Sequence, residues 1–394
     1  MISHDLFKGC RVIELASVLA GPSVGQFFAE LGAEVIKVEN PGTHGDVTRS
    51  WRGKGEKENT LSAYFCCTNW GKKSLALDIS KVPGQEILYK LIASSDFVIT
   101  SYKSGDAVRL GVDYETLSRH KKDLVYGEIT GYGQRDLKVG YDAVIQAEAG
   151  FMSMNGHEDG PPTKMPVALI DLLAAHQLKE AMLLAYIQKL QTGDGAYVSV
   201  SLLDAALASL ANQGTNWLMA KSNPQRKGST HPNIAPYGDI YHTRDSRQII
   251  LAVGTNRQFK QLCQVLDMKH IPEDIDFNTN ENRVKNRQKL LVLLAAKIRM
   301  WTGDLLIEKL NAANVPVGSV NTVAEALALP YASALLLKKN DFSGVRSFTE
   351  KGILEKSSHI LPPPQFGEHT QEILRDILSL DTSEINILIN KGTF

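Results

Sequence analysis

The stretch CRVIELASVLAGPSVGQFFAELGAEVIKVENP, residues 10–41, decides the fold of this chain. Residues 10–16 are rich in β-branched and aliphatic side chains and predict a strand. Pro22 suits the first turn of a helix, where its missing N–H costs nothing, and Gly32 suits the cap after that helix. Residues 33–39 predict a second strand. The order of strand, helix and strand predicts a βαβ unit.

The alternation of strands and helices continues beyond this unit. Residues 72–79, 96–102 and 123–133 predict three further strands, and most of the connections are short. Alternating strands and helices are typical of an α/β fold with a parallel sheet. From residue 141 the pattern becomes helical and includes a long apolar helix at about 169–191. Another strand and a helix extending to residue 220 follow it.

The composition changes after residue 220. Residues 221–236 form a polar, proline-containing stretch, and residues 237–254 predict a hairpin with its turn near Asp245 and Ser246. Helices are predicted at about 257–266, 281–300 and 303–313. The sequence therefore predicts three parts, which are a large α/β domain at 1–220, a smaller α+β domain at 221–325 and a linker with a C-terminal segment at 326–394.

Charge and composition exclude several classes of protein. The chain has 43 basic and 43 acidic residues, so nothing in its net charge favours nucleic acid or an anionic membrane. The N-terminus lacks the apolar core of a signal peptide, and no stretch has the 18 apolar residues of a membrane span. The four cysteines include no C-x-x-C pair, which argues against a disulfide framework or a structural zinc site. We expect a cytoplasmic protein.

The chain matches the known nucleotide-binding motifs only in part. The first turn offers Gly21 and Gly25 instead of the G-x-G-x-x-G fingerprint, so a nicotinamide or flavin cofactor is disfavoured. Glu39 lies about 20 residues past that turn, where a carboxylate can bind a ribose hydroxyl or simply face solvent. Lys72 and Lys73 do not belong to a P-loop, and they are either a solvated charge pair or a phosphate contact. No H-E-x-x-H motif is present, so no metal site is expected.

Asp171 is the one acid in the apolar run MPVALIDLLAAHQL. A buried, unpaired carboxylate is costly, so it needs either a partner or a chemical role. It could accept hydrogen bonds from backbone N–H groups at the start of a helix and face the helix dipole. It could also act as a nucleophile if a pocket opens beside it. The two interpretations are compatible.

Six segments occur in the order in which they occur in the class III CoA-transferases, and the chain resembles that family over residues 8 to about 330. The family includes formyl-CoA transferase, the carnitine-related CoA-transferase and α-methylacyl-CoA racemase. The segments are VIELASVLAGPSVGQFFAELGAEVIKVENP, GDVTRSW, GKKSLALDI, GYG followed by GYDAVIQAEAG, ALIDLLAAHQLKEAMLLAYIQKLQTGDGAYVSVSLLDA, and HPNIAPY. The resemblance implies a Rossmann-like domain that binds coenzyme A.

The resemblance also implies which residues contact CoA. The first strand-to-helix turn would line the pantetheine arm near the thioester, and the end of the second strand would approach the adenosine. The implied residues are Ser17, Val18, Leu19 and Ala20 in the turn, Glu39 and Asn40 at the strand end, and Lys72, Lys73, Ser101, Tyr102 and Arg109 further along. Lysine and arginine suit the phosphates, because charge-assisted hydrogen bonds are the stronger kind.

Asp171 falls where the family has its catalytic aspartate. The resemblance implies that Asp171 attacks an acyl-CoA thioester, and that CoA then moves through an aspartyl intermediate to a free carboxylic acid. CoA and acyl-CoA would be substrates, and no permanently bound cofactor is expected. Leu19 replaces a glutamine of formyl-CoA transferase, so a larger acid than formate is favoured.

An acyl-CoA racemase or epimerase on the same scaffold is the main alternative. The racemase branch carries G-H-D, whereas this chain has Gly140, Tyr141 and Asp142. Tyrosine has an ordinary pKa of about 10, against about 6.5 for histidine, and is therefore a poor base at neutral pH. Tyr141 would pack at a helix start or contact the substrate, and Asp142 would be a cap. A CoA-binding protein without activity and a nicotinamide oxidoreductase are weaker alternatives.

Members of this family are interlocked, ring-shaped homodimers, so the resemblance implies the same assembly here. The linkers near 200–230 and 325–350 are long enough for it, and the C-terminal segment would return to the large domain. His231 and Tyr237 of the smaller domain would then contact the acyl group of the substrate.

Overall fold

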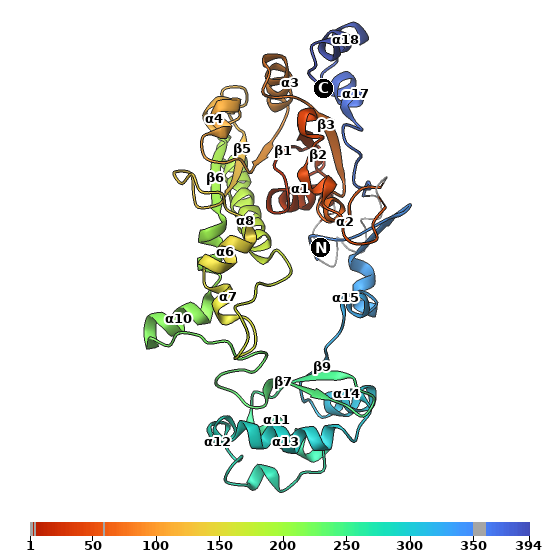
Figure 1. Cartoon of the computed structure of the whole chain (residues 1–394). Coiled ribbons are helices and arrows are strands. Elements are labelled where there is room, and N and C mark those ends of the chain that lie inside the picture. Colours follow the sequence, from red (N-terminus) through yellow and green to blue (C-terminus); the bar gives the residue numbers. More distant parts are fainter. Residues whose placement is uncertain (1–2, 4, 58–59, 350–359) are drawn as a thin grey trace. The chain divides into compact units, whose positions relative to one another are not determined.

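The computed structural model describes residue 3 and residues 5–57, 60–349 and 360–394 (Figure 1). The described chain divides into two compact units. The first comprises residues 1–149, 165–220 and 331–394, and the second comprises 150–164 and 221–330. Residues 150–164 therefore group with the second unit, although the sequence places them inside the stretch expected to form the large domain.

A six-stranded parallel sheet forms the centre of the first unit, with the strand order β3-β2-β1-β4-β5-β6. Its strands are β1 (Arg11–Leu15), β2 (Glu34–Glu39), β3 (Lys72–Ala76), β4 (Phe97–Thr100), β5 (Val125–Thr130) and β6 (Ala196–Ser201). The predicted α/β class with a central parallel sheet is confirmed. The order reverses between β1 and β4, and sheets of this kind bind ligands beyond the carboxyl ends of the strands at such a reversal.

Helices cover both faces of this sheet and so bury its strands on both sides, as is usual for a parallel sheet. On one face α1 (Ala20–Glu30) contacts β1 and β4, and α8 (Leu169–Thr192) contacts β5 and β6. On the other face Ile13 packs in a core with α3 (Val82–Ala93). The unit also contains η1 (Pro41–Thr43), η2 (Val47–Ser50), α2 (Ala63–Cys66), α4 (Asp106–Leu110), α5 (Tyr114–Leu117), α6 (Asp142–Glu148), α9 (Leu202–Ala208) and α10 (Ala211–Ala220).

The C-terminal segment lies along the edge strand β3. The N–H of Gly71 donates to Leu361 O over 2.9 Å, and the N–H of His369 donates to Ser74 O over 3.0 Å. This segment therefore pairs with backbone N–H and C=O groups that an exposed sheet edge would leave without partners. Its elements are β10 (Leu336–Lys339), β11 (Phe342–Val345), α17 (Thr370–Glu372), the π-helical turn η5 (Ile373–Ile377) and α18 (Thr382–Asn390).

The second unit has a core of its own around a three-stranded antiparallel sheet, with the order β7-β8-β9. The predicted hairpin is present as β7 (Tyr237–His242) and β8 (Gln248–Ala252), and β9 (Val317–Ser319) adds a strand that the sequence did not predict. The helices are α7 (Phe151–Met154), α11 (Asn256–Val265), η3 (Ile271–Glu273), α12 (Asn280–Lys285), α13 (Arg287–Ile298), α14 (Gly303–Ala312) and α15 (Val323–Leu327). The short helix η4 (Pro330–Leu335) spans the boundary between the units.

Two predicted helices are interrupted. The helix expected up to residue 220 breaks between α9 and α10, where Ala211 has a left-handed φ of 46°. The helix expected at 281–300 breaks at Asn286, whose side chain donates to Asp276 O over 3.0 Å. A polar side chain that hydrogen-bonds to nearby backbone competes with the helix, which explains the second break.

Candidate active site

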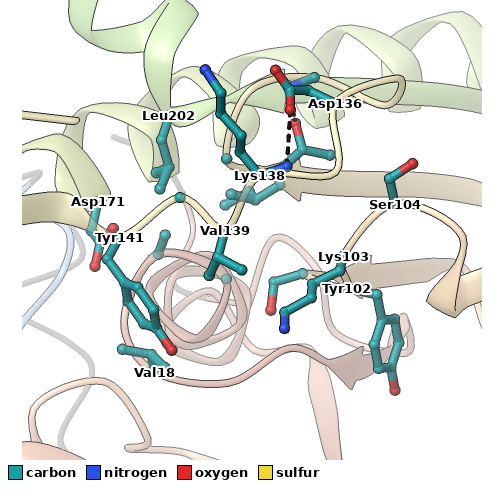
Figure 2. A pocket seen from close by; sticks show the side chains of 18 of the residues that line it. Val18, Tyr102, Lys103, Ser104, Asp136, Lys138, Val139, Tyr141, Asp171 and Leu202 are labelled. Carbon is teal, nitrogen blue, oxygen red and sulfur yellow. Dashed lines mark hydrogen bonds between the residues drawn. The ribbon is translucent and has the colours of Figure 1, made fainter. Parts of the chain in front are cut away.

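A cavity of about 250 Å³ lies at the carboxyl ends of β1, β4 and β5, where the strand order reverses. The start of α1 and the first turn of α8 complete its wall. Figure 2 shows Asp171, Tyr141 and Val18 on one side, with Lys103 and Tyr102 across from them. Seven of the residues singled out from the sequence line this cavity, namely Ser17, Val18, Ala20, Ser101, Tyr102, Tyr141 and Asp171.

Asp171 is in the first turn of α8 and is only 8% exposed. Within the described residues, no hydrogen bond or ion pair reaches its carboxylate. The N–H of Ile170 donates instead to Asp142 Oδ1 over 2.8 Å, and Gln146 Nε2 donates to Asp142 Oδ2 over 2.7 Å. The prediction that Asp171 caps its own helix is therefore wrong. Asp142 caps α8, which leaves Asp171 free to face the cavity.

The surroundings of Asp171 favour its protonated form. Burial, together with the nearby Asp142 carboxylate, raises the pKa of Asp171 to about 7. A carboxyl group with such a pKa is ionised in about half of the molecules at neutral pH. It is also more basic than an ordinary aspartate, which makes the ionised form a better nucleophile.

The N-terminus of α1 contributes backbone amides to the same cavity. Ala20 and Gly21, the first two residues of the helix, line the cavity, and the third residue, Pro22, has no N–H. The N–H groups of a first helical turn have no partner within the helix, and the helix dipole adds a partial positive charge there. This wall of the cavity therefore suits an oxyanion close to the Asp171 carboxylate.

The turn that leads into α1 is held from two sides. Val18 has a φ of 72°, an uncommon conformation for a β-branched residue, and its N–H faces the Asp46 carboxylate at 3.3 and 3.4 Å. The N–H of Ser17 donates to Ser101 Oγ over 3.2 Å. Ser17 also lines a second, more open cavity of about 870 Å³ together with Asp46 and Arg49.

Two predicted CoA contacts are buried away from the cavity. Lys72 is fully buried and uses its ammonium on Glu14, Pro22 O and Asn69, at 2.7 to 2.9 Å. Glu39 is 3% exposed and accepts from Arg49 and Ser74. Neither residue faces solvent, so that interpretation is wrong. The prediction that they contact CoA directly is also wrong, because their polar atoms already have protein partners.

Four other predicted residues of the first unit are exposed or half-buried. Lys73 pairs with Glu34 and Glu372, and the side chain of Arg109 is 67% exposed beside Asp106. Asn40 accepts from the N–H of Gly42 and caps η1. Leu19 is the N-cap residue of α1.

His231 and Tyr237 belong to the second unit. The N–H of His231 donates to Tyr237 O over 2.8 Å, and the two rings meet edge to face at 5.1 Å.

A family model of the CoA-transferases of family III matches residues 7–370. The chain belongs to CoA-transferase family III. It is 35% identical over 387 residues to the succinate–glutarate CoA-transferase of Agrobacterium fabrum, covering 95% of this chain and 96% of that protein. It is 32% identical to the human succinyl-CoA:glutarate CoA-transferase, covering 98% and 89%. A crystal structure of a CaiB/BaiF family protein from Brucella suis superimposes with a TM-score of 0.82 at 35% identity, covering 94% and 99%.

This CoA-transferase is therefore an enzyme that handles CoA thioesters and carboxylic acids. None of the helices in the described part of the chain is long and apolar enough to cross a membrane. No cluster of histidine, cysteine and acidic residues suited to a metal ion occurs among the same residues.

Several residues of the candidate site were not predicted from the sequence. Lys103 and Lys138 contribute cationic side chains to the cavity wall, and Asp46 anchors the turn at Val18. Both lysines lie in polar loops where charge is ordinary, so no pattern in the sequence marks them. A buried ion pair deeper in the domain did have a signal in the sequence. Glu14 and Lys37 are charged residues inside two apolar strands, and they lie opposite each other in the β1–β2 pairing.

Proposed function

We propose that this enzyme transfers CoA from an acyl-CoA to a free carboxylic acid through intermediates on Asp171. The observation that carries the proposal is the Asp171 carboxyl group, which is nearly buried, has no partner among the described residues and lies beside the amide end of α1. An unpaired carboxylate in such a place is costly to folding, which fits a group retained for chemistry.

The reaction proceeds as a balanced series of acyl transfers. A carboxylate oxygen of Asp171 attacks the thioester carbonyl, the carbon–sulfur bond breaks, and CoA thiolate leaves an acyl-aspartyl anhydride. The thiolate then attacks the aspartyl carbonyl, which releases the donor acid and forms an aspartyl-CoA thioester. The acceptor carboxylate repeats these steps in reverse. Each tetrahedral intermediate carries an oxyanion, which the amides of Ala20 and Gly21 are suited to stabilise.

The cavities support a location for CoA. Ser17 lines both the Asp171 cavity and the larger open cavity, so a ligand as long as CoA can extend from one into the other. We therefore place the thioester beside Asp171 and the pantetheine arm along Ser17, Val18, Ser101 and Tyr102. CoA is a substrate in this scheme.

A dicarboxylic acid is the substrate class that we propose. The A. fabrum and human relatives are named for succinate and glutarate, which are both dicarboxylic acids. Lys103 lines the cavity and forms no ion pair within the described residues, whereas the Lys138 ammonium, on the same cavity wall, lies over the Tyr132 ring at 5.0 Å. An ammonium group there can neutralise the second carboxylate of such a substrate while the first one reacts.

The test combines trapping with exchange. Wild-type enzyme is incubated with succinyl-CoA and hydroxylamine, and the protein is digested and analysed by mass spectrometry. We expect a hydroxamate on Asp171 and succinyl-CoA:glutarate exchange, both absent in Asp171→Ala. Modification at another residue, or full exchange by the variant, would refute the aspartyl mechanism. Deuterium incorporation at the acyl α-carbon without an acceptor acid would instead support the racemase alternative.

A further inference from the structure

Four charged side chains form an alternating row beneath α1, and we call Lys72, Glu14, Lys37 and Asp46 the buried charge row. Lys72 meets Glu14 at 2.7 Å, Glu14 meets Lys37 at 3.0 Å, and Lys37 meets Asp46 at 2.9 Å. All four residues are at most 5% exposed. Lys37 also donates to Ala16 O over 2.8 Å, just before the turn that carries Val18.

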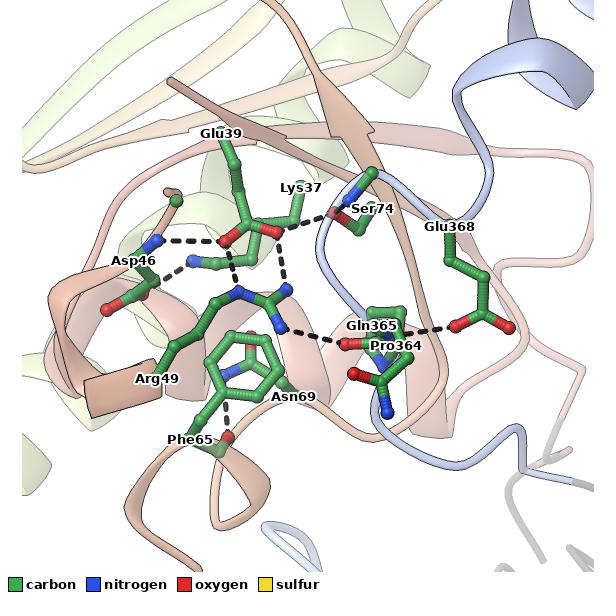
Figure 3. Close-up of polar contacts among 12 residues, drawn as sticks. Lys37, Glu39, Asp46, Arg49, Phe65, Asn69, Ser74, Pro364, Gln365 and Glu368 are labelled. Carbon is green, nitrogen blue, oxygen red and sulfur yellow. Dashed lines mark hydrogen bonds and ion pairs between the residues drawn. The ribbon is translucent and has the colours of Figure 1, made fainter. Parts of the chain in front are cut away.

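A second set of contacts fixes Asp46 from the other side (Figure 3). The N–H of Asp46 donates to Glu39 Oε1 over 2.9 Å, and Glu39 is held by Arg49 at 2.6 Å. The Arg49 guanidinium lies 3.7 Å from the centre of the Phe65 ring and donates to Pro364 O. The position of Asp46 is therefore determined by both its backbone and its side chain.

Stability alone is a poor explanation for such an arrangement. Buried ion pairs recover little more than the cost of removing both charges from water, and apolar side chains of similar volume often serve equally well. The buried charge row ends at the turn before α1. There the Asp46 carboxylate accepts from Val18 N–H as well as from the N–H and hydroxyl of Thr48. Val18 holds a left-handed conformation that persists only where its surroundings enforce it.

We propose that Asp46 is a positioning residue, whose carboxylate, held by Lys37, keeps Val18 left-handed and so aims the first amides of α1 at the carbonyl that Asp171 attacks. This inference rests on the proposed aspartyl mechanism. Val18 is followed by Leu19, the N-cap residue, and then by Ala20 and Gly21 in the cavity wall. A relaxed Val18 would redirect this short connection and displace the oxyanion donors. Asp46 touches no reacting atom in this scheme. It also lines the larger cavity, but it is only 5% exposed, so we expect its main effect to pass through the turn.

The main experiment compares Asp46→Asn with a matched control. Ser74→Ala removes the 2.6 Å contact to Glu39 from the same buried region but leaves the contact between Asp46 and Val18 intact. Asp46→Asn keeps one acceptor oxygen but removes the negative charge that Lys37 holds over 2.9 Å, so the side chain loses the ion pair that keeps it against Val18. We expect kcat of succinyl-CoA:glutarate exchange to fall about 10- to 100-fold, while KM for succinyl-CoA changes less than about threefold. Ser74→Ala is expected to keep kcat within about twofold. Equal losses in the two variants would show that Asp46 is only structural and would overturn the proposal.

A second experiment, in the Val18→Gly variant, tests whether Asp46 acts through the conformation of Val18. Glycine adopts the left-handed conformation without steric cost, so Val18→Gly needs the restraint from Asp46 less. The loss of kcat caused by Asp46→Asn should therefore shrink at least about fivefold in the Val18→Gly background. An undiminished loss would contradict the inference. The pH midpoint of kcat/KM should stay in place, because Asp142 and burial, not Asp46, raise the pKa of Asp171.

Two outcomes separate this inference from the proposed function. If wild-type enzyme forms the Asp171 hydroxamate and Asp46→Asn reacts at the same rate, only the positioning role fails. If wild-type enzyme forms no hydroxamate, the aspartyl mechanism fails first. Should Asp46→Asn not fold, Thr48→Val replaces it, because this variant removes the 2.7 Å hydroxyl contact to the same carboxylate. A fall in kcat at constant KM then supports the proposal, and an unchanged kcat overturns it.

Discussion

The environment of Asp171 opposes folding and supports reaction at the same time. Its side chain is nearly buried, and Asp142 occupies the capping position that would have paired it. Burial without a partner raises the carboxylate in free energy, and the same lack of partners leaves its oxygens available to a substrate carbonyl. The predictions at the scale of single residues follow from this conflict.

The pH dependence of the reaction should report the ionisation of Asp171. Only the carboxylate attacks a thioester, and the pKa of Asp171 is raised to about 7. We expect kcat/KM for succinyl-CoA to rise with pH and to reach half its maximum near pH 7. Stopped assays between pH 5 and pH 9 measure this directly. A profile that stays flat down to pH 5 would show that Asp171 ionises normally in the free enzyme.

Replacing Asp142 should shift that profile. Asp142→Asn keeps an oxygen that can accept from Ile170 N–H but removes the charge that raises the pKa of Asp171. The midpoint of kcat/KM is expected to move to lower pH, while burial keeps it above that of an ordinary aspartate. Gln134→Ala, outside this contact, serves as the control and should leave the midpoint unchanged. A shift to higher pH in Asp142→Asn would contradict the electrostatic account.

Removing the charge of Asp171 should stabilise the protein at the expense of activity. The pKa of Asp171 is raised in the folded state above its ordinary 3.8, so the ionised group destabilises the fold fully above about pH 7, and this penalty disappears as the pH falls toward 4. Asp171→Asn should therefore be more stable than the wild type by roughly 1–3 kcal/mol at pH 8. Urea denaturation at pH 8 and at pH 5 measures the difference. A stability gain that is equal at both pH values would rule out ionisation as its cause.

At the scale of secondary structure elements, the sequence predicts the strands and the main helices of the sheet because their patterns are local. Strand β1 and helix α1 follow from aliphatic runs, a proline and a glycine that act within a few residues. The burial of Lys72 could not be predicted in the same way. Its three partners come from β1, α1 and the loop before β3, and only the folded sheet brings them together.

Helix α1 approaches the sheet closely at Gly25, and this contact allows the buried charge row. A Cβ atom on Gly25 would lie 1.8 Å from Glu14 Oε2 and 3.3 Å from Lys72 Cε. Gly25→Ala must therefore displace Glu14 or lift the helix, which separates buried charges. We expect a loss of roughly 3–5 kcal/mol in unfolding free energy, measured by chemical denaturation. Gly254→Ala, whose nearest neighbour would lie 3.8 Å away, is the control and should lose less than about 1 kcal/mol.

At the scale of the whole molecule, the sequence shows the change of composition near residue 220, but the three consecutive parts expected from it differ from the two compact units of the structure. The first unit gathers three separate stretches of chain, and its last stretch lies along β3. Pairing between residues such as Ser74 and His369, nearly 300 positions apart, leaves no periodic signal in the sequence. Asp171 could be singled out as a candidate from its place in an apolar run and from a resemblance, whereas the contacts around the candidate site depend on this long-range assembly.

We propose that the enzyme is a homodimer, and exposed apolar side chains on the first unit support this. On α8, Leu184 and Leu190 are 69% and 68% exposed, and on α10, Leu218 and Met219 are 69% and 81% exposed. Several large apolar side chains in solvent on two helices are typical of a surface that another chain covers. Because one chain has a mass of 43.3 kDa, light scattering after size exclusion should give about twice that value.

The variant Leu184→Asp with Leu218→Asp tests whether these helices form the interface. Two carboxylates in a desolvated contact are expected to weaken the dimer enough for the chain to elute at its single mass of 43.3 kDa. Val82→Asp, at an isolated apolar residue that is 65% exposed at the start of α3, is the control and should remain dimeric. If the double variant stays dimeric while folded, the interface lies elsewhere. If the wild type is a monomer, the homodimer itself is refuted, and the CoA-transferase site must then work within a single chain.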